Sequence, residues 1–186
     1  MRRDELRLLL LEARRLTDAD EVLVIGSQSV LATWDDDELP EEVTRSREAD
    51  MLVRVRNGIR LTDSEADYVS GFLESSGVLS EFDLEHGIHI DSVSPNTATL
   101  PEGWEGRLVP ISAIGEDGTE VIGLCLDPYD ACVSKLVAFR EHDREFVGHM
   151  IRAALVKPAT ILDRLMGLAP GVEANHAYVF VQGFMD

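Results

Sequence analysis

The sequence contains only two cysteines, and no apolar run in it approaches the roughly 20 residues that a membrane span needs. Cys125 and Cys132 stand seven residues apart without a CxxC pair or a nearby pair of histidines, so their spacing argues against a zinc site. The leucine-rich stretch near the start is followed by Glu12, Arg14 and Arg15, which is typical of an amphipathic helix rather than of a secretion signal. We therefore expect a cytoplasmic protein with two buried thiols and no membrane partner.

Positive charge is also scarce. The chain has 17 Lys and Arg residues against 35 Asp and Glu residues, which gives a formal net charge of −18. Such a protein repels polyanions on average, so non-specific binding to nucleic acids or membranes is disfavoured. The arginines are concentrated in two groups, Arg45, Arg47, Arg54, Arg56 and Arg60, and Arg140, Arg144, Arg152 and Arg164. A locally basic face can therefore exist within an acidic surface.

Apolar periodicity divides the chain into helices and strands. Residues 4–16 have the helical period, residues 21–26 form a short β-branched run that ends in glycine, and residues 49–56 alternate as in a half-buried strand. In chain order, we expect a helix over 4–16, a strand over 21–26, a helix over 27–34, a strand over 49–56, a helix over 61–77, and strands over 87–93, 107–114 and 121–127. Helices are then expected throughout 127–171, with breaks near His142 and at Pro158.

The order of these elements predicts the fold class. A chain of 186 residues forms one domain, or one domain with a helical appendage. Asp127 followed by Pro128 is a typical helix start, and it separates the part with strands from a part that is helical throughout. We expect a mixed α/β (α+β) core over 1–126 and a C-terminal helical segment over 127–186 packed on it.

The turn at Gly26 and Ser27 is the first candidate for a binding site. The strand that ends here runs directly into the next helix, which has Ser27 or Ser29 near its cap position. A helix N-terminus presents unpaired N–H groups and a partial positive charge, so it can bind phosphate. The turn lacks the Gly-Lys-Ser/Thr of a P-loop and is also common as a plain connection. Alone, it does not decide between these interpretations.

Three acids are candidates for metal binding. Glu48 and Asp50 stand two apart at the start of a strand, so the period of two directs both carboxylates to one face, where their oxygens could hold magnesium. Asp91 follows an apolar run, where a charge without a partner is unfavourable. A shared metal site would explain all three, although a solvated strand edge or a helix cap would explain each of them separately.

Lys135 is the fourth candidate, because it is one of only two lysines in the chain. Its neighbours at three and four residues along the expected helix are mostly apolar, so the side chain either extends out to solvent or reaches into a site. Arg140 and Asp143 follow one and two turns later.

The order of these features resembles that of the nucleotidyltransferase superfamily. Within it, the chain is similar to the AbiEii-like toxins of type IV toxin–antitoxin systems and their MenT-type relatives. The segments that carry the resemblance are VLVIGSQSVLAT (22–33), SREADMLVRV (46–55), GIHIDSVSPNTATLPEGWEGRLVPI (87–111) and LDPYDACVSKLVAFREHDREFV (126–147). The resemblance implies a mixed sheet flanked by helices. It also implies a magnesium-dependent transfer of a nucleoside monophosphate from a nucleoside triphosphate (NTP) to a hydroxyl acceptor, with the 3′ end of tRNA as acceptor and an antitoxin protein as partner.

The resemblance also assigns roles to individual residues. It implies that the turn at Gly26, Ser27 and Ser29 cradles the phosphates, and that Lys135 contacts the triphosphate. It further implies that Glu48, Asp50 and Asp91 hold two magnesium ions, that Asp91 helps to deprotonate the acceptor hydroxyl, and that Asp143 belongs to the catalytic set.

The chain departs from the superfamily pattern at the first acid, where Glu48 stands in place of the usual aspartate. Asp35 and Asp37 offer a rival pair at shorter spacing, but no apolar strand follows them. Two alternative functions stay open. One is a catalytically silent module that binds a nucleotide or a partner. The other is a small-molecule nucleotidyltransferase of the antibiotic-modifying type, for which the acidity would favour a cationic substrate.

Overall fold

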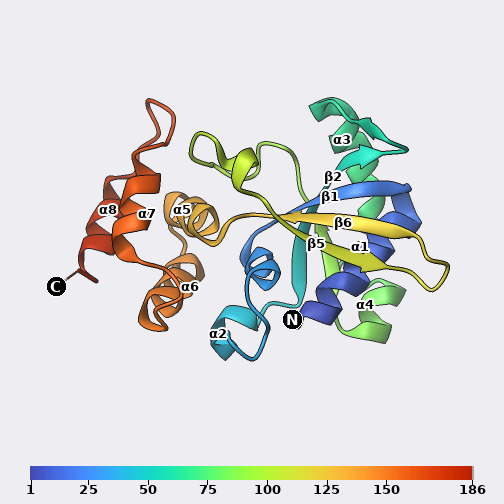
Figure 1. The fold of residues 1–186 in the computed structure, drawn as a ribbon, viewed down its shortest axis with the longest axis horizontal. Helices are drawn as coiled ribbons and strands as arrows, with labels where there is room; N and C mark the ends of the chain where they lie inside the picture. The colour runs from blue at the N-terminus through green and yellow to red at the C-terminus, as the bar shows by residue number, and fades with distance from the viewer. Residues whose placement is uncertain (186) are drawn as a thin grey trace.

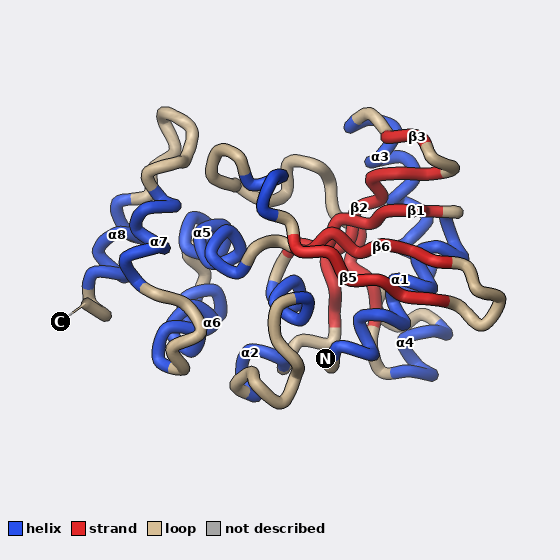
Figure 2. The backbone as a smooth tube through the Cα atoms, in the orientation of Figure 1, coloured by secondary structure: helices blue, strands red, loops and turns tan. Residues whose placement is uncertain are grey.

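Six strands form one mixed sheet in the computed structural model, which describes residues 1–185 (Figure 1, Figure 2). The strands are β1 (Ala19–Ile25), β2 (Glu48–Arg56), β3 (Ile59–Arg60), β4 (His89–Ser92), β5 (Val109–Ile114) and β6 (Glu120–Cys125). Their order across the sheet is β3-β2-β1-β6-β5, and β4 also pairs with β2. Helices flank the sheet, and further helices gather at one end of it, so the expected mixed α/β class with a C-terminal helical segment is confirmed (Figure 1).

Strand β1 lies in the middle of the sheet and is buried on both faces. It pairs antiparallel with β2 and parallel with β6. Its side chains alternate between two apolar clusters: Val22 and Val24 belong to the larger cluster, and Leu23 and Ile25 to a smaller one. A strand buried on both faces needs a continuous apolar run, which is why this strand could be predicted from the sequence.

The edge of β2 that faces away from β1 is shared by two strands. β3 pairs antiparallel with residues 55–56, and β4 pairs parallel with residues 48–51. Between β3 and β4 the chain forms α3 (Asp63–Ser70), the 3-10 helix η2 (Gly71–Ser76) and α4 (Glu81–His86). A parallel connection requires a crossover of this kind, and here it brings β4 beside the first residues of β2.

The helix expected first is confirmed as α1 (Arg3–Thr17), which buries Leu6, Leu9 and Leu10 at the helical period. The helix expected over 27–34 is corrected: this segment forms a shorter 3-10 helix, η1 (Ser27–Ala32). Its cap position is Gly26, and no side chain caps it.

The helix expected over 61–77 is also corrected, because it is divided between α3 and η2. The division falls at Gly71, and glycine is a weak helix former. The short helix α4 was not expected. It is capped by the Ser80 hydroxyl, which accepts a hydrogen bond from the backbone N–H of Asp83.

Four helices form the C-terminal part: α5 (Pro128–Ala138), α6 (Glu141–Arg152), α7 (Pro158–Leu165) and α8 (Asn175–Gln182). The Asp127 carboxylate accepts hydrogen bonds from the backbone N–H groups of Tyr129 and Asp130, which confirms the expected start of α5. Just before this start, the N–H of Leu126 donates to the carbonyl of Val24 in β1. The break expected near His142 falls earlier, at Phe139, whose φ is 54°.

One cluster of buried apolar side chains extends from Leu6 in α1 to Val181 in α8, so the core is continuous across the boundary expected at residue 126. Cys125 and Cys132 are buried and free, as expected, and burial raises the pKa of each thiol to about 12. Over residues 1–185, no helix has both the length and the apolar character that crossing a membrane requires.

Candidate functional site

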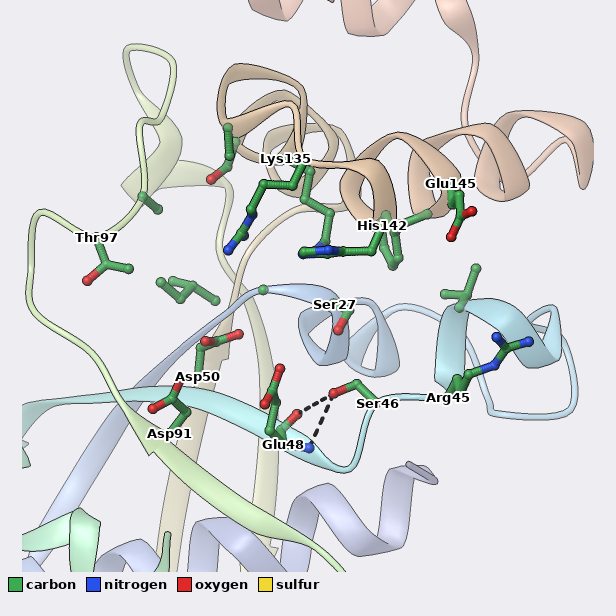
Figure 3. Close-up of a pocket in the computed structure, with 18 of the residues that line it drawn as sticks. Ser27, Arg45, Ser46, Glu48, Asp50, Asp91, Thr97, Lys135, His142 and Glu145 are labelled. Carbon is green, nitrogen blue, oxygen red and sulfur yellow. Dashed lines mark hydrogen bonds between the residues drawn. The ribbon is translucent and has the colours of Figure 1, made fainter. Parts of the chain in front are cut away.

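A cleft of about 840 Å³ opens where the sheet meets the C-terminal helices (Figure 3). The end of β1, the start of β2 and β4 line one side, and α5 and α6 line the other. The short helix α2 (Glu41–Thr44) contributes to one end. The charged and histidine residues that line it are Glu42, Arg45, Glu48, Asp50, Asp91, Lys135, Arg140, His142, Glu145 and His149. Side chains from segments far apart in the sequence therefore meet in one cleft.

The three acids predicted from the sequence lie on the sheet side of the cleft (Figure 3). The parallel pairing of β2 with β4 places Asp50 directly beside Asp91, and Glu48 is two residues away from Asp50 on the same face of β2. Burial of Asp50, reinforced by the charges of Asp91 and Glu48, raises the pKa of its carboxyl group to about 6. The charges of Lys135 and Arg140 oppose this shift without cancelling it. The acids therefore hold negative charge at close range in a partly buried place.

The chemistry of these acids suits a divalent cation. Within residues 1–185, neither Asp50 nor Asp91 has a Lys, Arg or His partner within 4.0 Å, so their charge is available to a ligand. Carboxylate oxygens are the ligands that magnesium prefers. Over the same residues, no three His, Cys, Asp or Glu side chains are grouped closely enough to form a metal site as they lie. The donor type and charge thus fit a cation, whereas a closed coordination shell is not already formed.

Gly26 brings the backbone close to Asp50. Its φ of 73° and ψ of −161° fall in a region that is open almost only to glycine. A Cβ atom at this position would overlap with the carboxyl group of Asp50. The residue before Gly26, Ile25 at the end of β1, is the register partner of Asp50 in β2. A residue with a side chain would therefore both strain the turn and displace the central acid.

The two serines of the turn lie in different surroundings. Ser27 lines the cleft, at the first residue of η1. Ser29 is fully buried and lies outside the cleft, and its hydroxyl donates a hydrogen bond of 2.8 Å to the carbonyl of Gly26. Of the two, Ser27 can reach a ligand, while Ser29 fixes the shape of the turn.

Lys135 lies on the side of the cleft opposite the acids (Figure 3), and both Lys135 and Arg140, which also lines the cleft, are held by Asp143. The fully buried Asp143 carboxylate accepts hydrogen bonds from Lys135 Nζ at 3.2 Å and from Arg140 Nε at 2.7 Å. Burial alone would raise the pKa of Asp143, but the hydrogen bond from Arg140 and the charge of Lys135 outweigh it and lower that pKa. Asp143 does not line the cleft itself, so it reaches the site through these two cations.

Sequence reasoning missed one end of the cleft, which Arg45, Ser46, Glu145 and His149 line. Arg45 and Ser46 precede β2 in a stretch that has no periodicity, so nothing in the sequence gives their side chains a direction. Glu145 and His149 are four residues apart on α6 and share a face. That spacing is a usable signal, but it is equally common on helix faces that only meet solvent.

The family model described as "Nucleotidyltransferase of unknown function (DUF6036)" matches residues 4–166, which include every residue that lines the cleft. This match confirms the superfamily expected from the sequence, while the narrower likeness to AbiEii-like toxins stays a prediction. Searches of curated proteins and of solved structures find no match.

Proposed function

The chain belongs to the nucleotidyltransferases of unknown function (DUF6036), and on that premise we propose that its cleft transfers a nucleoside monophosphate from an NTP to a hydroxyl acceptor in a magnesium-dependent reaction. The observation that carries this proposal is the arrangement of charge across the cleft. Glu48, Asp50 and Asp91 lie on one side and Lys135 lies on the other (Figure 3), and Arg140, which also lines the cleft, shares the carboxylate of Asp143 with Lys135. A triphosphate bound between a metal ion and these cations would be neutralised from both directions.

Different residues of the cleft would have different roles in this reaction. Lys135 and Arg140 would bind the phosphate oxygens, together with the hydroxyl of Ser27. Glu48, Asp50 and Asp91 would hold magnesium, which supplies positive charge at the entering and leaving oxygens. The exposed carboxylate of Asp91 would accept the proton of the acceptor hydroxyl. The hydroxyl oxygen then forms a bond to the α-phosphorus, and the bond from that phosphorus to pyrophosphate breaks.

As the acceptor, we propose the 3′ end of tRNA, so that the protein would be the toxin of a toxin–antitoxin pair. The likeness to AbiEii-like toxins motivates this choice, and the charge distribution is compatible with it. Among residues 1–185, the Lys and Arg side chains without a carboxylate within 4.0 Å are Arg45, Arg144, Arg152 and Lys157. Arg45 lines the cleft, Arg144 and Arg152 are on α6, and Lys157 precedes α7. Of these four, Arg45 is the one that lines the cleft, so it is the cation that the end of an RNA could contact there.

The test is transfer of radiolabelled nucleotide. The protein is incubated with each of the four α-labelled NTPs, magnesium and total RNA, and the products are separated by size. A labelled tRNA band that disappears when EDTA removes the magnesium is the expected result. If no label is transferred to RNA and no NTP raises the melting temperature, the proposal is wrong. Nucleotide binding without any transfer would favour the catalytically silent module instead.

A second candidate function is transfer to a small cationic molecule that carries a hydroxyl group. The acidic residues Glu42 and Glu145 at one end of the cleft favour it, because they would attract a cation and repel a polyanion. The same labelled NTPs, incubated with an aminoglycoside in place of RNA, distinguish the two acceptors.

Replacing Asp143 with asparagine is expected to lower the free energy of unfolding by about 1–3 kcal/mol, because two charge-assisted hydrogen bonds in a buried place are weakened. Lys135 would also lose its fixed direction, so KM for the NTP should rise by about tenfold, which corresponds to one such hydrogen bond. Urea unfolding and steady-state kinetics measure the two effects. Glu141→Gln, an exposed neighbour on α6, is the matched control and should change neither value. Unchanged KM in Asp143→Asn would contradict the positioning role.

The pKa of Asp50 predicts a pH dependence of stability in metal-free protein. The folded state raises this pKa from 3.8 to about 6, so the folded protein holds the proton more tightly than the unfolded chain does. The resulting stabilisation, at most about 3 kcal/mol, is full below about pH 4 and is lost as the pH rises through 6. Urea unfolding between pH 4 and pH 7.5 should show a decline of this kind in the natural protein, and a smaller one in Asp50→Asn. Equal slopes in the two proteins would refute the assignment to Asp50.

A further inference from the structure

The lining of the cleft changes from charged to uncharged along its length. Figure 3 shows Thr97 on one side of Asp50 and Asp91, and Arg45 and Glu145 on the other side. The residues that line the cleft without a charge include Ile25, Thr97, Ala98, Thr99 and Ser134. The loop from residue 94 to 103 supplies three of them, and α5 supplies Ser134. The cleft therefore has charged residues in its middle and at the end with Arg45, whereas at the end with Thr97 the 94–103 loop contributes only apolar groups and hydroxyls.

The 94–103 loop is fixed at both of its ends. At its start, the Ser94 hydroxyl donates a hydrogen bond of 2.6 Å to Asp67 of α3. Just after its end, Arg107 donates hydrogen bonds of 2.8 and 3.1 Å to the fully buried carboxylate of Asp130 in α5. Between these points, Ala98 packs against the smaller apolar cluster, which includes Ile25 of β1. The loop is thus a preformed wall rather than a free flap.

Two hydroxyl groups that line the cleft, one in this loop and one on α5, are available to a ligand. Thr99 is exposed, and Ser134, one residue before Lys135 on α5, is partly exposed. Over residues 1–185, neither side-chain hydroxyl has a hydrogen-bond partner, whereas Thr97 Oγ1 already accepts from the N–H of Ser94. A hydroxyl can both donate and accept a hydrogen bond, so the pair can recognise heteroatoms at the edge of a planar ring.

We propose that this uncharged end is the nucleoside subsite of the cleft, and that Thr99 and Ser134 select the nucleobase. This inference rests on the proposed function, because it takes the acids in the middle of the cleft as the place of the α-phosphate. An NTP has a charged tail and an uncharged ring with its sugar. When the tail lies against Lys135 and Arg140, the nucleoside falls to the end that has no charge. Discrimination then arises because a base whose edge presents no donor or acceptor to one of the two hydroxyls forms one hydrogen bond fewer.

The test compares binding of four nucleotides in matched proteins. Dissociation constants for ATP, GTP, CTP and UTP are measured by calorimetry in the presence of magnesium, for the natural protein and for the double variant Thr99→Val with Ser134→Ala. Inorganic tripolyphosphate is measured beside them, because it has the charged tail without the nucleoside. Thr33→Val is the control, since Thr33 is exposed and lies outside the cleft.

The expected result is that the preferred NTP binds about tenfold more weakly to the double variant, as for the loss of two neutral hydrogen bonds. The other NTPs and tripolyphosphate should change less than twofold, so the preference among the four is reduced. Equal affinities of the natural protein for all four NTPs, or the same preference in the double variant, would overturn the subsite. A uniform loss that includes tripolyphosphate would overturn it too. Failure of the natural protein to bind any NTP would instead defeat the proposed function.

Discussion

An Asp50→Asn variant should lose nucleotide transfer on the order of 10³-fold in kcat/KM, as when a single group that stabilises charge is removed from an active site. Asp50 is the central acid of the cleft: it pairs in register with Asp91, follows Glu48 on the same strand and lies against Gly26. Asparagine keeps the shape of the side chain but removes the charge that would hold the metal.

The same substitution should not weaken the metal-free fold. Burial and the neighbouring acids raise the pKa of Asp50 to about 6, which means that the ionised carboxylate is unfavourable there. Its removal should leave the melting temperature at neutral pH equal or higher, while the stabilisation by magnesium disappears. Scanning calorimetry with and without magnesium, beside the transfer assay, measures both effects. Asp163→Asn, at an exposed position on α7, is the control and should retain full activity. An Asp50→Asn protein that still transfers nucleotide would overthrow the proposed site.

Gly26→Ala is the second substitution with a large expected effect. The new Cβ atom would occupy the place of the Asp50 carboxyl group, and the backbone at this position is strained for any residue with a side chain. We expect a loss of about 1–3 kcal/mol in the free energy of unfolding, from the backbone conformation. Displacement of Asp50 should lower kcat/KM by about 10²-fold, as expected when reacting groups move by about 1 Å.

Gly58 is a matched control that separates the effect of backbone strain from the effect of displacing Asp50. Gly58 has the same φ of 73°, but a Cβ atom there would meet nothing within 4 Å. Gly58→Ala should therefore destabilise the protein through backbone strain and leave nucleotide transfer unchanged. Urea unfolding and the transfer assay on both variants give the comparison. Equal losses of activity in the two variants would show that overall stability, rather than the contact with Asp50, sets the effect of Gly26→Ala.

The helices and strands that could be predicted from the sequence are those whose signal lies in consecutive residues of the chain. β1 was evident because its run of four apolar residues, Val22–Ile25, must be covered on both faces. α1 and the start of α5 were evident because their signals, helical periodicity and an Asp-Pro cap, are local in the chain. The edges of the sheet were less predictable. β3 has two residues and α4 has six, so their formation depends on the neighbours that they pack against.

The sequence indicated which residue types belong to the site, but it indicated only partly which way their side chains point. Asp91 could be predicted as a site residue because a charged residue directly after an apolar run is unfavourable without a partner. The sequence did not show which residue lies beside it. That neighbour, Asp50, is set by the parallel pairing of β4 with β2 across a crossover of more than thirty residues. Ser29 and Asp143 were predicted as site residues, yet both are fully buried and neither lines the cleft. Whether a side chain on a helix turns toward a cleft or away from it depends on tertiary packing, which one sequence does not contain.

The junction at Leu126 and Asp127, where the chain leaves the sheet and enters α5, divides the cleft into two incomplete half-sites. All of the acids proposed to hold metal precede it, and both cations proposed to hold phosphate follow it. A fragment that ends at this junction would keep mutually repelling carboxylates with no counterpart, and the remaining fragment would keep cations with no metal. Interrupted translation at this junction would therefore yield a piece that has the acids and lacks the cations. Catalytic competence would be an all-or-none property of the assembled chain.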